Sequence, residues 1–292
     1  MNSTRNRRVK HTVVGALIAA AGLGLAVAPA SADVLLSDNF NSYTSGNLMG
    51  QGPWVQVPTE PASTLPYDDV QVSGGAVVLT PGDGTTTAGQ WVEAALTPAV
   101  KRTSADQSIY YAADISVTSA AAGDYFMSVR NSGTSKSYAA QLWAKADPAD
   151  ATGTKYLLGL SIASGGLVWG TDDLTLGQTY HIVAQYLLTG SANGSTDYAN
   201  LYVDPADAAT QANDTPYAAT SSNTGKSSGL ANLDLREGTQ PLAPLVPISP
   251  TVTLDNLVVS TDFTSAAVTP EPASLALIGL AGAFLLSGRR RG

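Results

Sequence analysis

Paired carboxylates would be the most direct chemistry for this chain, because two of them can cleave a glycosidic bond. The two groups must flank that bond about 5 to 9.5 Å apart, a spacing that residues i and i+2 on one strand provide. Between residues 33 and 269 the glutamates are Glu60, Glu93 and Glu237, and no two acidic residues are spaced i, i+2. Glu93, in a predicted strand beside Trp91, is the best single candidate for an acid, although an outward-facing strand residue explains it more simply. Carboxylates from different strands could still converge, so the count disfavours hydrolysis without closing the question.

Nucleophilic catalysis has less support. A Ser-His-Asp arrangement needs a base held by a third group and a nucleophile in reach, and His181 is the single histidine between residues 33 and 269. Residues 225–229 match G-x-S-x-G, but they lie in a Ser/Thr/Gly-rich segment without the strand-to-helix turn that the motif requires. With one histidine and no cysteine, a zinc site is not expected.

Aromatic residues on a polar strand face indicate carbohydrate recognition instead. Period-two alternation places Trp143 with Gln141 and Lys145 on one face of a strand, and Tyr138 on the opposite, apolar face. Tyr110 is placed similarly on the polar face of its own strand. An aromatic plane edged by hydrogen-bonding groups can hold a sugar ring. The predicted ligand-binding residues are therefore Trp143, Gln141, Lys145 and Tyr110, unless this face forms a second core layer or is covered by a loop.

Three acidic clusters are candidate calcium ligands, because Ca²⁺ takes six to eight oxygen ligands that loops can supply. The residues are Asp68, Asp69, Asp172, Asp173, Asp204 and Asp207. The competing interpretation is that these aspartates cap turns and solubilise a lysine-poor surface. Ca²⁺ is the one cofactor that the sequence suggests, and none is required by it.

Period-two alternation recurs in the segments that must position these residues. It predicts strands at 108–117, 125–130, 138–145, 156–162, 180–188, 198–203 and 252–259, with shorter ones at 34–40, 77–79, 90–94 and 233–236. Turn sequences such as Asn193-Gly194 separate them. No amphipathic helix of 10–15 residues lies between the strands, which argues against a parallel α/β sheet. We therefore predict an all-β fold, a two-sheet antiparallel jelly-roll sandwich.

Composition limits the partners. Residues 33–269 carry 22 acidic against eight basic side chains, a net charge of about −14, which repels nucleic acid. The absence of cysteine excludes disulfides and thiolate metal sites. About 235 residues suffice for one sizeable core.

An apolar segment beside a basic cluster begins the chain. Residues 1–11 contain Arg5, Arg7, Arg8 and Lys10 with no acidic residue, and an apolar run covers residues 12–27. Ala30 and Ala32 provide the small-x-small pattern that signal peptidase accepts. We predict a signal peptide at residues 1–32 and a mature chain that starts near Asp33. The alternative is an uncleaved membrane anchor, for which the run is short.

A second apolar segment ends the chain. Residues 273–287 carry no charge and as a helix would extend about 22 Å, less than the roughly 30 Å hydrocarbon core of a bilayer. Arg289, Arg290 and Arg291 follow and should stay cytoplasmic, with the preceding domain outside. The N-terminal signal requires the same orientation.

This tail, with Pro270, Glu271 and Pro272 before the apolar helix and the arginines after it, resembles the PEP-CTERM sorting signal of bacterial exported proteins. The resemblance implies recognition and cleavage near the triplet by a membrane protease, an exosortase. It also implies a transient inner-membrane tether and final sorting to the cell surface or the extracellular polysaccharide matrix. A permanent anchor that is never cut is the alternative.

Several short motifs resemble bacterial concanavalin A-like (LamG-like) jelly-roll domains. They are D-N-F at residues 38–40, G-Q-G-P-W at 50–54, L-G-Q-T-Y-H-I-V at 176–183, L-Y-V-D-P at 201–205 and L-D-N-L-V-V at 254–259. Such domains bind glycans or serve as architectural modules. Hydrolytic relatives carry Glu-x-Asp-x-Glu, which this chain lacks.

The predicted organisation is therefore a signal peptide (1–32), a concanavalin A-like sandwich (33–264), and a linker with the sorting tail (265–292). We expect an exported, non-catalytic module that binds extracellular polysaccharide. The alternative is a glycoside hydrolase or polysaccharide lyase of the same fold.

Overall fold

Two antiparallel sheets dominate the computed structural model, which describes residues 33–57, 65–83, 86–131, 138–162, 166–190, 196–206, 211–222, 227–238 and 249–268. The predicted signal peptide and sorting tail lie outside these residues. So do the predicted processing residues and one predicted calcium ligand, namely Ala30, Ala32, Pro270, Glu271, Pro272, Arg289, Arg290, Arg291 and Asp207.

Sheet A has the strand order β17-β16-β15-β9-β19-β6-β5-β2, and β1 pairs with the second half of β19. Its strands are β1 (Val34–Asp38), β2 (Gly46–Asn47), β5 (Gln71–Ser73), β6 (Ala76–Leu79), β9 (Gln107–Ser119), β15 (Thr179–Leu188), β16 (Asp197–Val203), β17 (Ala218–Ser222) and β19 (Thr251–Ser260).

Sheet B has the order β13-β12-β11-β10-β18-β8-β3, and β14 also pairs with β12. Its strands are β3 (Val55–Gln56), β8 (Trp91–Lys101), β10 (Asp124–Arg130), β11 (Tyr138–Ala146), β12 (Lys155–Ser161), β13 (Val168–Trp169), β14 (Leu174–Thr175) and β18 (Gly229–Arg236). Two short parallel strands, β4 (Tyr67–Asp68) and β7 (Ala88–Gly89), stand apart from both sheets.

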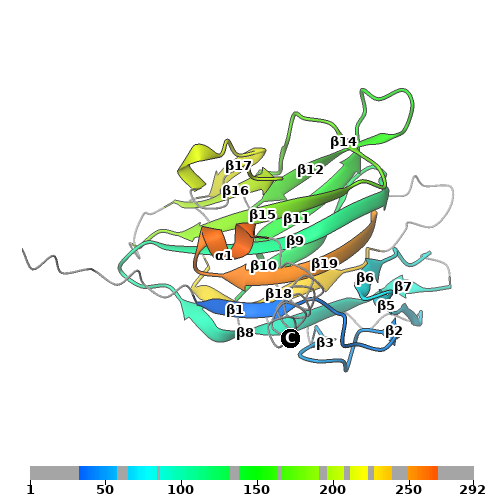
Figure 1. Cartoon of the computed structure of the whole chain (residues 1–292), viewed down its shortest axis with the longest axis horizontal. Helices are drawn as coiled ribbons and strands as arrows, with labels where there is room; N and C mark the ends of the chain where they lie inside the picture. Colours follow the sequence, from blue (N-terminus) through cyan, green and yellow to red (C-terminus); the bar gives the residue numbers. More distant parts are fainter. Residues whose placement is uncertain are drawn as a thin grey trace, which may run out of the picture. The chain divides into compact units, whose positions relative to one another are not determined.

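The predicted two-sheet antiparallel jelly-roll sandwich is confirmed (Figure 1). The strand that the sequence underestimated most is β8, predicted to end at residue 94 but extending to Lys101. Its second half, Ala95–Lys101, contains Pro98 and little alternation, because this stretch is largely exposed at the edge of the sandwich. The two-residue strands were missed because they are too short to show a period.

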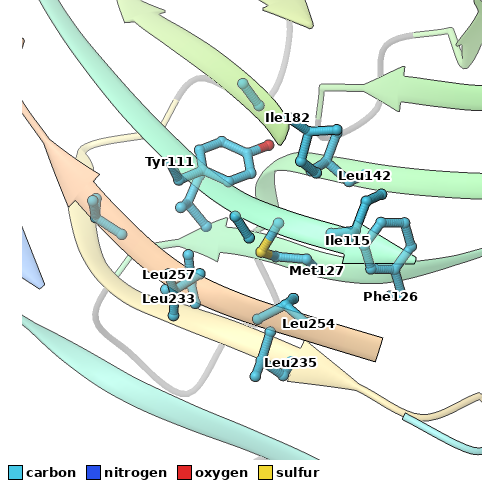
Figure 2. Packing of buried hydrophobic residues seen from close by; sticks show 14 of the residues in the cluster. Tyr111, Ile115, Phe126, Met127, Leu142, Ile182, Leu233, Leu235, Leu254 and Leu257 are labelled. Carbon is cyan, nitrogen blue, oxygen red and sulfur yellow. The ribbon is translucent and has the colours of Figure 1, made fainter. Parts of the chain in front are cut away.

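The core lies between the sheets and consists of the apolar half of each alternation. From sheet A, Tyr111, Ile115 and Leu254 point inward and are essentially unexposed. Met127 and Leu142 meet them from sheet B (Figure 2). Burial of each such side chain contributes about 1.5–3 kcal/mol, so these alternations set which face of each sheet is left for function.

A short helix covers part of the outer face of sheet A. Helix α1 (Phe263–Ala267) begins at Asp262, whose Oδ2 accepts from Ser265 N at 2.9 Å. The ring of Phe263 packs edge-on against Tyr110 and Tyr202, at centroid distances of 5.6 and 5.5 Å (Figure 1 shows α1 in orange). The predicted domain boundary at residue 264 falls inside this helix. In the described ranges, no helix has the length and apolar character needed to cross a membrane.

Candidate functional site

The outer face of sheet B collects large aromatic and polar side chains. Val92, Leu142 and Leu235 point into the core with no exposed area, so their neighbours point outward. This places Trp91 (β8), Arg236 (β18) and Trp143 (β11) on the outer face, on three strands of one sheet.

Two β-bulges add two tyrosines to this face. A register shift between Tyr125 and Met127 lets the consecutive residues Phe126 and Met127 both enter the core (Figure 2). The side chain of Tyr125 is thereby turned outward. A second shift, opposite Arg130, makes Ala139 and Ala140 consecutive core residues. Tyr138 is thereby moved to the Trp143 face. The prediction that Tyr138 shares the apolar face was wrong, because unbroken alternation cannot anticipate a bulge.

The aromatic rings form a continuous group, called here the aromatic row. Its members are Trp91, Tyr125, Tyr138, Trp143 and Trp169. Tyr125 is the centre, with its ring centroid 6.1 Å from Trp91, 5.5 Å from Tyr138 and 5.4 Å from Trp143. Cross-strand pairing continues from Trp143 through Gly159 to Trp169. Because the row crosses six adjacent strands from β8 to β13, it spans about 24 Å.

Gly159 makes room for the last ring of the row. A Cβ atom at this position would lie 2.6 Å from Cε3 of Trp169. The indole therefore lies against the backbone of β12, and a side chain at residue 159 would displace it.

An acid–arginine cluster lies beside the row. Glu93 on β8 pairs directly with Asp234 on β18, and both carboxylates contact the guanidinium of Arg130 on β10. Arg130 Nε lies 2.8 Å from Asp234 Oδ2, and Nη2 contacts Glu93 Oε2. All three residues are more than nine-tenths buried. Burial raises the pKa of Asp234 to about 7, against the opposing charge of Arg130.

Two further cations rest on the aromatic rings. The guanidinium carbon of Arg236 lies 4.2 Å from the ring centroid of Tyr125 and 4.9 Å from that of Trp91. Arg236 Nη1 also contacts Asp124 Oδ2 at 2.7 Å and donates to Tyr125 O at 3.1 Å. Lys145 Nζ lies 4.4 Å from the centroid of Trp169. Stacking of this kind restrains the long side chains and fixes where their charges are presented.

Hydrogen-bonding groups line the same face. Trp143 Nε1 donates to Ser161 Oγ at 2.9 Å, and Ser161 Oγ donates to Gln141 Oε1 at 3.2 Å. Ser128 Oγ and Arg236 Nε are buried without a hydrogen-bond partner in the described part of the chain. Both atoms are buried beneath this face, so the polar groups that remain for a ligand are those of Gln141, Trp143 and Ser161.

The structure brings together three of the four predicted ligand-binding residues. Gln141, Trp143 and Lys145 all lie on the outer face of sheet B. Tyr110 does not: it is on the outer face of sheet A, is 6% exposed, and donates to Gln211 Oε1 at 2.6 Å. It packs under α1 because Phe263 covers its ring, an arrangement that no local pattern could have revealed. Tyr110 is therefore excluded from the candidate site.

His181 joins sheet A to α1. Its Nδ1 lies 2.7 Å from Asp114 Oδ1 and its Nε2 lies 3.0 Å from Ala266 O. Burial alone would raise the pKa of Asp114, but hydrogen bonds from His181 and Asn256 lower it overall. These two contacts tie the imidazole ring to both elements, so His181 is a structural link between sheet A and α1.

Two of the described candidate calcium ligands, Asp204 and Asp69, accept hydrogen bonds through their carboxylates. Asp204 Oδ1 accepts from His181 N at 2.8 Å, and Asp69 Oδ1 from Gln90 Nε2 at 3.3 Å. The Asp172 backbone carbonyl accepts from Tyr217 at 2.7 Å. Within the described ranges no three His, Asp or Glu side chains converge as a metal site. Calcium binding by Asp68, Asp69, Asp172, Asp173 and Asp204 stays a prediction, and Asp207 lies outside the described residues.

Two cavities lie away from the aromatic row. The larger, of about 570 Å³, is lined by residues of β1, β8 and β9 with charged and apolar character and no aromatic ring. The second, of about 360 Å³, is lined mainly by β8 and β18 residues and Asn131. A polymer binds along an open row more readily than in a compact cavity, so we assign the site to the row.

Comparison with known proteins identifies the sorting tail. The model of the PEP-CTERM protein-sorting motif matches residues 268–291. No curated protein matches the sequence. The chain carries a sorting signal of exported proteins, which are anchored transiently in the membrane and then sorted to the cell surface or the extracellular matrix. The motif also implies processing by an exosortase.

Three solved structures are similar at low sequence identity. The CBM2 module of the evolved Dit of Lactobacillus casei BL23 phage J-1 is 8% identical, with 79% of this chain and 96% of that chain covered and a TM-score of 0.43. A family 16 glycosyl hydrolase from Mycobacterium smegmatis is 12% identical, with 78% of this chain and 100% of that chain covered and a TM-score of 0.42. The alginate lyase AlgAT5 from polysaccharide lyase family 7 is 14% identical, with 66% of this chain and 81% of that chain covered and a TM-score of 0.41. At these identities and TM-scores the likenesses assign neither ligand nor reaction.

Proposed function

We propose that the mature protein is a surface- or matrix-sorted, non-catalytic module that binds extracellular polysaccharide through the outer face of sheet B. The observation that carries the proposal is the aromatic row, five rings on one face edged by Gln141, Ser161 and the two stacked cations. Aromatic planes with adjacent polar groups bind ligands that have both apolar faces and hydroxyl edges, as sugars do. Export and sorting place this face where such polymers occur.

The length of the row supports a polymeric ligand. About 24 Å of surface accommodates several consecutive sugar rings, and the row runs across adjacent strands, with Arg236 on β18 and Gly159 on β12 between the rings. Trp143 lies between Tyr125 and Gly159 in the pairing and is the central tryptophan. Its indole N–H is bound to Ser161, which orients the ring before a ligand arrives.

The test is affinity of the mature protein for matrix polysaccharides, measured by calorimetry and by retardation in polysaccharide-containing native gels. Trp143→Ala should weaken binding at least about fivefold, if a sugar ring stacks as strongly as a nucleobase does on an aromatic side chain, about 1–3 kcal/mol per ring. Tyr198→Ala is the matched control, because Tyr198 is a 45% exposed aromatic on sheet A. Equal loss in both variants, or no retardation by any polysaccharide, would refute the proposal.

Hydrolysis or elimination is the second candidate, favoured by one observation. Glu93 and Asp234 lie directly opposite each other on neighbouring strands, which places their Cβ atoms about 5 Å apart. In retaining glycosidases the two carboxyl groups are about 5–5.5 Å apart. The raised pKa of Asp234 would suit a general acid. However, both carboxylates are bound to Arg130 and are buried, which favours a structural role. Release of reducing ends or unsaturated sugars that disappears in Glu93→Gln would establish catalysis.

A further inference from the structure

The cations of the described part of the chain are concentrated on one face. Four of its six lysines and arginines, namely Arg130, Lys145, Lys155 and Arg236, lie on the outer face of sheet B. The mature segment as a whole has a net charge of about −14. An anionic polymer is therefore repelled by most of this protein's surface and least by the aromatic row.

The carboxylates on this face are already paired. Glu93 and Asp234 bind Arg130, and Asp124 binds Arg236. Among the described residues no carboxylate lies within salt-bridge distance of Lys145, whose ammonium instead rests over Trp169. Lys155 lies at the edge of the face, where its Nζ donates to Thr175 Oγ1 at 2.7 Å beside the turn formed by Asp147 and Asp150. Lys145 is thus the cation of this face that is both central and unpaired.

The stacked cations also cover ring faces that a sugar could otherwise contact. One face of Trp91 and of Tyr125 is occupied by Arg236, and Trp169 is occupied by Lys145 on one side and by the Gly159 backbone. Three of the five rings of the row therefore brace a positive charge. Trp143 lies between the two cations. Lys145 is two residues along the same strand, about 7 Å away, and Arg236 is two strands away, about 10 Å across the sheet.

We infer that the polysaccharide is carboxylated, with a uronic acid ring on Trp143 and its carboxylate bound by Lys145. Arg236, 16% exposed at its side chain, adds positive potential on the other side of the same ring. The ammonium needs little ordering on binding because Trp169 already restrains it, so the charge-assisted hydrogen bond is formed at low entropic cost. This inference rests on the proposed function and specifies its ligand class.

The experiment compares polygalacturonate with the same polymer after reduction of its carboxyl groups, using calorimetry on the mature protein at low and moderate salt. We expect the reduced polymer to bind at least tenfold more weakly, as expected for loss of a hydrogen bond to a charged group. Lys145→Met keeps the stem on Trp169 and removes the charge, so it should abolish the difference between the two polymers. Lys145→Arg should preserve it, and Lys101→Met, which alters an exposed lysine at the end of β8, should have no effect.

The outcomes separate the two claims. Equal affinity for the two polymers, or an unchanged preference in Lys145→Met, overturns the carboxylate inference while polysaccharide binding stands. Equal binding of polygalacturonate and dextran sulfate overturns it as well, because it would show attraction to charge alone. Absence of binding to any polymer, neutral ones included, overturns the proposed function itself.

Discussion

Glu93 lies directly opposite Asp234 on the neighbouring strand, and the two carboxylates share one guanidinium, that of Arg130. The pair and its arginine come from three adjacent strands, β8, β18 and β10. Sharing one cation between two buried carboxylates leaves the cluster with an excess of negative charge when both are ionised. Burial raises the pKa of Asp234 to about 7, against the opposing charge of Arg130.

Removal of the shared cation should be strongly destabilising. Arg130→Met leaves two buried carboxylates facing each other, and loss of one partner of a buried ion pair costs about 3–5 kcal/mol. Urea unfolding at pH 8 measures this change. Adding Glu93→Gln and Asp234→Asn to Arg130→Met should recover most of the loss, because it removes the unpaired charges. Lys101→Met, at an exposed position, should change stability by less than about 0.5 kcal/mol.

The stability of the domain should fall as pH rises through neutrality. Burial raises the pKa of Asp234 to about 7 and that of Glu237 to about 8, although backbone N–H groups of Thr80 and Gln90 donate to Glu237. Both groups bind a proton more tightly in the folded state than in the unfolded state, where their pKa values are near 4. Their contribution is therefore complete below about pH 4 and is lost as pH rises through 7 to 8.

Thermal unfolding at pH 5.5 and 8.5, at constant ionic strength, measures this dependence. We expect a melting temperature several degrees lower at pH 8.5. Asp234→Asn and Glu237→Gln should each reduce the difference, and a melting temperature that rises with pH would contradict the assignment.

Loss of the α1 contact should affect stability and leave ligand binding intact. Phe263→Ala removes a ring that is 5% exposed and packs on Tyr110 and Tyr202, so we expect a loss of about 3 kcal/mol. Tyr110→Phe removes the hydrogen bond to Gln211 and should cost about 1 kcal/mol. Calorimetric affinity for polysaccharide should match the parent in both variants. Weaker binding by Tyr110→Phe would restore Tyr110 to the site.

A side chain at residue 159 should disturb the end of the row. In Gly159→Ala the new methyl group would overlap the Trp169 ring, so the indole must move away from β12 and from Lys145. We expect weaker polysaccharide binding with little loss of stability, because Trp169 is only partly buried. Tryptophan fluorescence of the variant reports the displacement, and an unchanged spectrum with unchanged affinity would show that the ring position is unimportant.

Calcium should have little influence on stability. The carboxylates of Asp69 and Asp204 already accept hydrogen bonds, and within the described ranges no three acidic or histidine side chains converge. We expect the same melting temperature in EDTA and in millimolar calcium. A calcium-dependent rise would demonstrate a site, since a ligand that binds the folded state raises its stability by mass action.

Much of the site could be anticipated from local sequence. The alternation Gln141, Trp143, Lys145 against Leu142 and Ala144 was enough to place three side chains on one face, because a strand repeats every two residues. Tyr125 and Tyr138 could not be assigned to it, since each depends on a bulge that reverses the alternation. A bulge is decided by how two strands pair and pack, and neither strand shows it alone.

By itself, the sequence determined the sandwich class, the sorting tail and the polar face of β11, and it predicts the export signal. These follow from patterns within short segments: a two-residue period, an apolar run beside basic residues, and a proline triplet. Only the tertiary structure decided that Glu93 meets Asp234, that five rings form one row, and that Tyr110 lies beneath α1. Each of these joins residues from strands or helices distant in the chain, and such contacts depend on strand order and register, which a local period does not contain.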